Sequence, residues 1–168
     1  MKYLMMESAD QAALYADLGS MPDFLTSVFA DLSSAEAARS VPEDALSPVE
    51  QCWHLADLEC EGFSVRIRRL LEESEPFLLG FDGARYVRER QYKQKSLAEG
   101  ISAFRQARLD NLALLKTISG ERWMRKGQQE EVGVVALCDL PVMMAEHDAG
   151  HRKEIETWRQ ASSARTER

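Results

Sequence analysis

SPVEQCWHLADLECEGFSVRIRRL, the stretch from residue 47 to residue 70, decides the fold. Ser47 is a good helix N-cap, Pro48 suits the first helical position, and Glu50 completes an S-x-x-E capping box. Apolar residues then recur every three or four positions: Val49, Trp53, Ala56, Cys60, Phe63, Ile67 and Leu70. This spacing predicts an amphipathic helix with one buried face, ending between Glu72 and Pro76.

Three further segments have the same helical period. The first carries an apolar lane from Leu14 to Leu32, and we expect a kink or a restart where Gly19–Pro22 interrupts it. A second capping box, Ser96 to Glu99, opens another helix that runs to about Ile118, and the last helix spans about 136–161. The sequence therefore predicts an all-α four-helix bundle in one domain, residues 1–161, followed by a disordered tail, residues 162–168.

Two connections between these helices are long. The segment from Pro76 to Lys95 contains four aromatic residues, so we expect a packed loop rather than a disordered one. Glycines punctuate the connection after Ile118, where a short turn or hairpin is expected around residues 123–131.

Composition excludes several classes of protein. The net charge is −7, which disfavours a nucleic-acid partner because a phosphate backbone needs a basic surface. Neither a signal peptide nor a membrane-spanning segment is evident, so we expect a cytoplasmic protein that does not bind membranes. The cysteines are Cys52, Cys60 and Cys138, an odd number without C-x-x-C spacing, and we interpret them as reduced core thiols.

The chain contains three histidines. His147 and His151 are four residues apart, which places their side chains about 6 Å apart on one face of a helix. Both lie in the apolar lane of the last helix, and His54 lies near the start of the 47–72 helix. Two interpretations follow from the residues alone: a metal site with three imidazole ligands and an open position, or hydrogen-bonded core histidines with His54 exposed.

Two segments carry a family resemblance. Residues 54–59, HLADLE, and residues 144–151, MAEHDAGH, resemble the metal-site motifs of the DinB/YfiT-like superfamily. The segments Phe104-x-x-x-Arg108 and Trp123-x-Arg125-x-Gly127, and the order of the helices, are similar as well. The resemblance covers most of the chain.

The resemblance implies a bundle with up-down-down-up topology that often dimerises. It assigns one divalent metal ion to His54, His147 and His151, with zinc or nickel expected first. Family activities include metal-dependent hydrolysis and S-transfer that depends on a low-molecular-weight thiol. Members commonly carry a histidine after the R-x-G segment, where this chain has Gln128 and Gln129.

Other polar residues are candidates for the site. Asp57 and Glu61 follow His54 by one and two helical turns. Asp57 is a candidate to orient a ligand or accept a proton and Glu61 to reach the pocket, and the alternative for both is a solvated acid or a salt-bridge partner. Arg108 and Asn111 continue an apolar lane of their helix, and two interpretations are open. Either both face inward, with Arg108 binding an anionic substrate or pairing with Glu61, or the helix is rotated so that Leu109 and Leu112 carry the packing.

Glu146 and Asp148 flank His147 but leave its lane, and we interpret them as surface acids. We expect a small-molecule substrate to enter at the bundle end between the start of the second helix, the middle of the last and the loop 76–95. Two classes of function remain. The chain is either a metal-dependent hydrolase or thiol S-transferase, or a non-catalytic bundle in which metal stabilises the fold or a homodimer.

Overall fold

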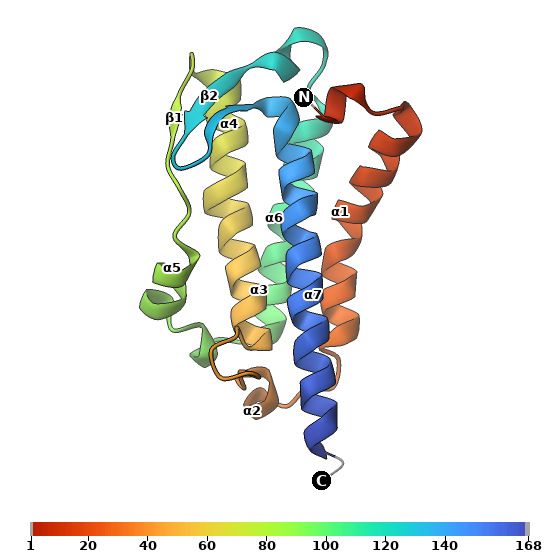
Figure 1. The fold of residues 1–168 in the computed structure, drawn as a ribbon, viewed down its shortest axis with the longest axis vertical. Coiled ribbons are helices and arrows are strands. Elements are labelled where there is room, and N and C mark those ends of the chain that lie inside the picture. Colours follow the sequence, from red (N-terminus) through yellow and green to blue (C-terminus); the bar gives the residue numbers. More distant parts are fainter. Residues whose placement is uncertain (1, 167–168) are drawn as a thin grey trace.

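Four long helical rods form the molecule (Figure 1). The structure is a computed structural model that describes residues 2–166, with side chains described as far as Ser163. The rods are α1 (Ser8–Val28), α3 with α4 (Pro48–Asp57 and Ser64–Glu72), α6 (Leu97–Lys116) and α7 (Leu140–Thr166). The last helix starts later than expected and continues to Thr166, and residues 167–168 of the expected tail lie outside the described part.

The direction of the rods gives the expected bundle topology. The rod of α3 and α4 runs parallel to α6, while α1 and α7 run the opposite way (Figure 1). Parallel neighbours require the chain to travel the length of the bundle between them, which explains why the connection from residue 76 to residue 95 is long. The all-α four-helix bundle with up-down-down-up topology is therefore confirmed.

Both predicted capping boxes stand at helix starts. The Glu50 carboxylate accepts hydrogen bonds from the Ser47 backbone N–H at 2.8 Å and from its hydroxyl at 2.7 Å. At α6, the Ser96 hydroxyl accepts from the Glu99 N–H at 3.2 Å. These contacts satisfy polar groups that a helix start leaves without intrahelical partners.

The second rod contains a π-helical segment, η2 (Leu58–Phe63), between α3 and α4. A π-turn adds a residue to the helical turn and shifts the positions that face the core. Glu59 is consequently buried, whereas Cys60 is exposed. The interpretation of Cys60 as a core thiol is wrong for this reason, while Cys52 and Cys138 are buried.

Helix α1 continues through Pro22, so the expected restart there is wrong. Proline lacks an N–H and leaves the carbonyl four residues earlier, that of Leu18, without its helical donor. The buried guanidinium of Arg108 supplies that donor, from Nη1 to the Leu18 oxygen at 3.0 Å. A contact from α6 thus satisfies the carbonyl that Pro22 leaves free inside α1.

The connections contain short elements that periodicity did not predict. The expected hairpin is β2 (Lys126–Gln129) with β3 (Gly133–Ala136), paired antiparallel, and β1 (Phe77–Leu78) adds to β2 in parallel. Gln128 and Gln129 lie in β2. The remaining helices are α2 (Ser34–Ala37), α5 (Gly83–Arg90), and the 3-10 turns Lys2–Met5, Tyr92–Gln94, Gly120–Met124 and Leu137–Asp139.

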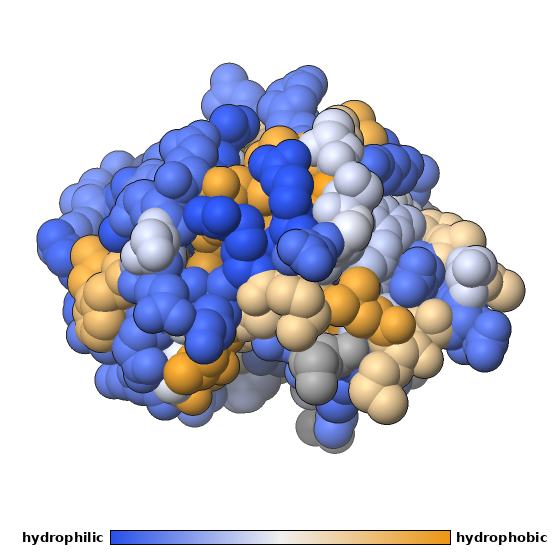
Figure 2. Space-filling model, turned by 90° about the horizontal axis from the view of Figure 1, so that it is seen from above, coloured by the Kyte–Doolittle hydropathy of each residue, from blue (hydrophilic) through white to orange (hydrophobic). Residues whose placement is uncertain are grey.

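Two apolar clusters fill the bundle between the rods. One contains Leu18, Ile67, Leu115 and Met144, and the other contains Leu25, Leu55, Phe104 and Ile155. The surface at the sheet end is mostly hydrophilic, with scattered apolar patches (Figure 2). None of the described helices is long and apolar enough to cross a membrane.

Candidate metal centre

The bundle brings the three histidines together. His54 comes from α3, and His147 and His151 come from successive turns of α7. One ring nitrogen from each lies within 4.8 Å of the corresponding nitrogens of the other two. The nearest pair is His147 Nε2 and His151 Nε2, at 3.1 Å. His151 is buried and the other two are partly buried, so the alternative interpretation, which leaves His54 exposed, is wrong on that point.

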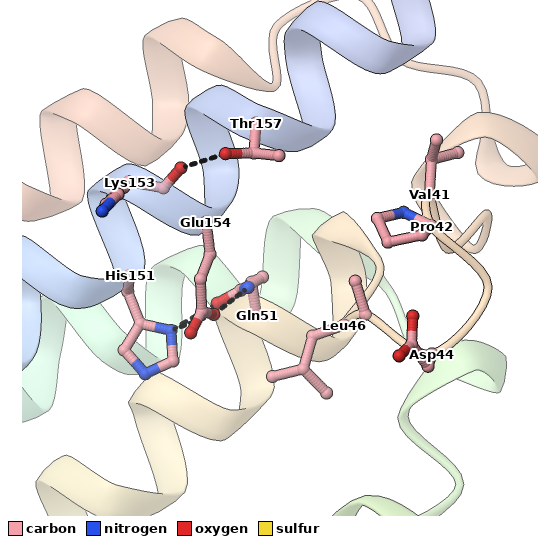
Figure 3. Close-up of a pocket in the computed structure, with 10 residues that line it drawn as sticks. Val41, Pro42, Asp44, Leu46, Gln51, His151, Lys153, Glu154 and Thr157 are labelled. Carbon is pink, nitrogen blue, oxygen red and sulfur yellow. Dashed lines mark hydrogen bonds and ion pairs between the residues drawn. The ribbon is translucent and has the colours of Figure 1, made fainter.

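A chain of hydrogen bonds orients His151. Its Nδ1 lies 2.5 Å from the Gln51 side-chain oxygen, and the Gln51 amide donates to Glu154 Oε2 at 2.8 Å (Figure 3). Because an amide oxygen only accepts, Nδ1 of His151 carries a proton, which in the neutral tautomer leaves the lone pair on Nε2. The lone pair therefore points at the centre of the cluster, as in metal sites whose ligands are fixed by outer hydrogen bonds.

The imidazoles are held in the form that binds metals. Burial first, and the neighbouring His151 second, lower the pKa of His54 to about 4 and that of His147 to about 3. A hydrogen bond with His151 is the main cause that lowers the pKa of Glu154 to about 2. Near neutral pH, His54 and His147 are therefore neutral and Glu154 is charged.

The donor set fits a divalent ion. Three imidazoles converge, and the 3.1 Å between His147 Nε2 and His151 Nε2 is close to the spacing of two ligands on one ion, since metal–nitrogen bonds of about 2.0–2.1 Å place two ligands slightly over 3 Å apart. The buried Nδ1 of His54 has no hydrogen-bond partner among the described residues. Among the described residues, no further histidine, cysteine or carboxylate joins the three histidines. A bound ion would therefore keep an open coordination position.

Helix α5 closes one side of the cluster. A Cβ placed on Gly83 would lie 2.5 Å from His54 Cε1 and 2.7 Å from its Nδ1, so only glycine fits against this ring. The Phe81 ring meets His54 edge to face, with centroids 5.9 Å apart. The long connection therefore packs on the site, as expected of a packed loop.

Asp57 and Glu61 fasten that segment to the bundle. Asp57 accepts a short hydrogen bond from the Tyr92 hydroxyl and pairs with Arg90 at 2.7 Å. Glu61 pairs with Arg90 at 2.7 Å and accepts from the Tyr86 hydroxyl at 2.7 Å. Both carboxylates are thus engaged by the 83–92 segment, and the structure gives them a role in holding it against His54.

Arg108 and Asn111 do face inward, and their partners differ from those expected. Arg108 bonds both oxygens of Asp148, at 2.6 and 2.9 Å, and reaches Glu59 Oε2 at 3.0 Å. Asn111 donates to the carboxylate and the carbonyl of Glu59, each at 3.0 Å. The expected pair of Arg108 with Glu61 is wrong because the π-turn directs Glu59 inward in its place.

Asp148 is buried, so its interpretation as a surface acid is wrong, whereas Glu146 is exposed. Only 1% of Asp148 is exposed, and its carboxylate is held by Arg108. Burial raises the pKa of Glu59, against the lowering effect of Arg108 and Asn111. We call Glu59, Arg108, Asn111 and Asp148 the arginine cluster.

A cavity of about 520 Å³ opens beside His151. Gln51, Glu154 and Thr157 line it on the helix side, and apolar residues of the 41–46 loop face them (Figure 3). The described residues that line this cavity include the loop before α3 and none of the loop 76–95. The volume lies within the range of small-molecule sites.

Sequence reasoning missed Gln51, Glu154 and Gly83. The first two were accessible in principle, since a histidine that binds metal through one nitrogen needs an acceptor for the other. Gln51 precedes His54 by three residues and Glu154 follows His151 by three, so each lies one helical turn from a predicted ligand. No local signal distinguishes Gly83 from an ordinary turn glycine.

Comparison with known proteins agrees with this architecture. The chain is similar in fold to YfiT from Bacillus subtilis, described as a probable metal-dependent hydrolase with an unusual four-helix bundle topology. The TM-score is 0.84 at 14% sequence identity, over 94% of this chain and 90% of that one. No curated protein matches the sequence. The sequence profile of the DinB superfamily matches residues 18–155, and the chain therefore belongs to the DinB superfamily.

Proposed function

We propose that His54, His147 and His151 bind one divalent metal ion and that the protein is a metal-dependent hydrolase of a small molecule. The observation that carries the proposal is the position of His151, which belongs to the histidine cluster and also lines the 520 Å³ cavity. Gln51 and Glu154, the partners of His151 Nδ1, also line the cavity, so an ion bound at Nε2 would lie across the His151 ring from it. The description of YfiT as a probable metal-dependent hydrolase supports the same reaction class.

The ion would supply Lewis acidity, lowering the pKa of a water molecule that it binds. The residues of this chain prepare the position. Gln51 and Glu154 hold His151 in the tautomer that presents its Nε2 lone pair, and α5 covers His54. Zinc or nickel suits three imidazoles best. Val41, Pro42 and Leu46 give the cavity an apolar wall, which favours a substrate with an apolar portion.

A purely structural metal is the competing interpretation. Such sites are closed, with the coordination completed by protein ligands. Here the group has three ligands in the described part of the chain and borders a cavity. The open position favours an enzyme over a metal that only stabilises the bundle or a homodimer.

Metal content tests the first half of the proposal. Protein purified without added metal should contain about one divalent ion per chain by elemental analysis. His147→Ala should lose that ion, whereas Glu146→Ala should keep it because Glu146 is an exposed acid on the same turn. Full metal occupancy in His147→Ala would refute the site.

Blocking the cavity tests the second half. A panel of esters, amides and thiol-transfer substrates is screened with metal-loaded protein, using chelation as the control. Thr157→Trp should fill the cavity and suppress turnover without loss of metal, while Glu156→Trp, an exposed neighbour outside the lining, should not. Turnover only with an added low-molecular-weight thiol would identify a transferase, and no turnover on the panel would favour the structural interpretation.

A further inference from the structure

A second cavity, of about 280 Å³, lies between the second rod and the segment that leads into α5. Gly62 and Val65 line it from the rod, and Leu79, Gly80 and Phe81 line it from the segment. It shares no lining residue with the cavity at His151. An inference about it therefore stands apart from the proposed hydrolase.

Arg66 projects into this cavity from α4 as a buried charge without a partner. Its side chain is 7% exposed, and its Nε is buried without a hydrogen bond. Within residues 2–166, no carboxylate pairs with its guanidinium, and the interaction found is with the Phe63 ring, 5.7 Å from Cζ to the centroid. Burial without an opposing carboxylate lowers the pKa of Arg66.

The other charged residues of the cavity wall are already engaged. Arg69 forms two hydrogen bonds with the Glu73 carboxylate, and Arg85 pairs with Glu89. Glu61 is held by Arg90 and Tyr86, as described above. Asp82 accepts from the Arg85 backbone N–H at 2.9 Å. Among these described residues, Arg66 is thus the cation whose charge nothing balances.

Arg108 shows what the same side chain requires when it is buried. Arg108 is 1% exposed and is bound by two carboxylates and a carbonyl. A buried charge is costly unless it is paired and hydrogen-bonded, and guanidinium has no neutral form in proteins. Arg66 is also buried, but no carboxylate among the described residues pairs with its guanidinium. It lines a cavity instead.

We propose that this cavity is a binding site for a small oxyanion, a carboxylate or phosphate group, held by the Arg66 guanidinium. Guanidinium matches both groups through planar, two-pronged hydrogen bonds, which are strong when they are partly desolvated. The apolar side chains of Val65, Leu79 and Phe81 accommodate the carbon skeleton of a small organic acid or phosphomonoester. The class of ligand follows from the charge of Arg66 and the size of the cavity.

Nuclear magnetic resonance tests the proposal on the full chain. The Nε–H signal of Arg66 is followed while sodium acetate or sodium phosphate is added, against sodium chloride at matched ionic strength. A saturable shift with acetate, phosphate or both, absent with chloride, is the expected result, and the two arms tell carboxylate from phosphate recognition. Amide shifts should map to Gly62, Gly80 and Phe81.

Two variants localise the effect. Arg66→Met removes the charge and keeps the stem, and should weaken binding of the anion about tenfold or more. Arg85→Met, on the same wall but paired with Glu89, should keep binding. Equal shifts with chloride, no shift, or undiminished binding in Arg66→Met would overturn the proposal. If Arg66→Met does not fold, the wild-type titration and its map of amide shifts decide.

Discussion

The histidine cluster and the arginine cluster meet on α7, where Asp148 directly follows His147, and they differ in what completes them. In the arginine cluster a single guanidinium is matched by carboxylates and carbonyls of the protein itself. In the histidine cluster two ring nitrogens face each other at 3.1 Å, and a third imidazole stands beside them. The arginine cluster is buried throughout, whereas in the histidine cluster His151 is buried and the other two rings are partly buried.

The difference separates a cluster that the protein satisfies by itself from the proposed metal site. Buried polar groups are stable when every donor and acceptor is matched, and the arginine cluster approaches that state within the protein. The histidine cluster presents lone pairs to one another, which a cation between them would satisfy. Burial alone therefore does not indicate a ligand site. Buried acceptors that no protein donor satisfies, next to a cavity, do indicate one.

Arg108→Met should have the largest effect on stability. It leaves the carboxylates of Glu59 and Asp148 buried without a cation, which should cost about 3–5 kcal/mol of the free energy of unfolding. Urea denaturation measures the loss. Arg105→Met removes an exposed pair with Asp23 and should cost less than about 1 kcal/mol. A loss of stability below about 1 kcal/mol in Arg108→Met as well would show that the arginine cluster does not stabilise the bundle.

Acidification should destabilise the metal-free protein through the histidine cluster. Burial lowers the pKa of His54 and His147 from 6.5 to about 4 and about 3, so below pH 6.5 the unfolded chain binds more protons than the folded one. Stability is therefore full above pH 6.5 and falls as the pH drops toward these values. Each histidine contributes at most about 1.4 kcal/mol per pH unit.

Urea titrations in the presence of a chelator at pH 7.0 and pH 5.5 measure this effect. The double variant with His54→Gln and His147→Gln should lose most of the pH dependence between these values. An unchanged dependence would assign it to other groups.

Gln51→Leu should weaken metal binding while leaving the three ligands in place. Without the acceptor at Nδ1, His151 loses its fixed tautomer and orientation, and metal affinity should fall about 10- to 100-fold. Competition with a chromophoric chelator measures the affinity. Gln106→Leu, which removes a glutamine bonded to Asp110 on the α6 surface, serves as the control. Equal affinity in both variants would mean that Gln51 does not position His151.

Gly83→Ala should have the smallest effect, confined to His54. The added Cβ would lie 2.5 Å from the ring, so α5 or the imidazole must shift, and metal affinity should fall up to about tenfold. Gly150→Ala, on α7 between the two histidines of that helix, meets no atom within 4 Å and should leave affinity unchanged. A stronger effect at Gly150 would contradict the packing of α5 on His54.

The prediction of which residues of the second rod are buried failed at its π-helical segment. Counting residues in steps of three and four from Trp53 places Cys60 on the buried face, and it does so only while the helix keeps its period. The π-turn from Leu58 to Phe63 changes the period, exposes Cys60 and buries Glu59. Glu59 was therefore not recognised as a partner of Arg108. Nothing in the local sequence separates such a turn from a regular helix.

The sequence by itself determined the four helices, their capping boxes, the family and the choice of histidines, because helical period, capping and spacing are local properties of the chain. Only the tertiary structure decided which acid meets Arg108, that Gln51 orients His151, that Gly83 abuts His54, and that Arg66 is left unpaired beside a cavity. These contacts join residues from different rods or connections, and their geometry depends on how the rods pack.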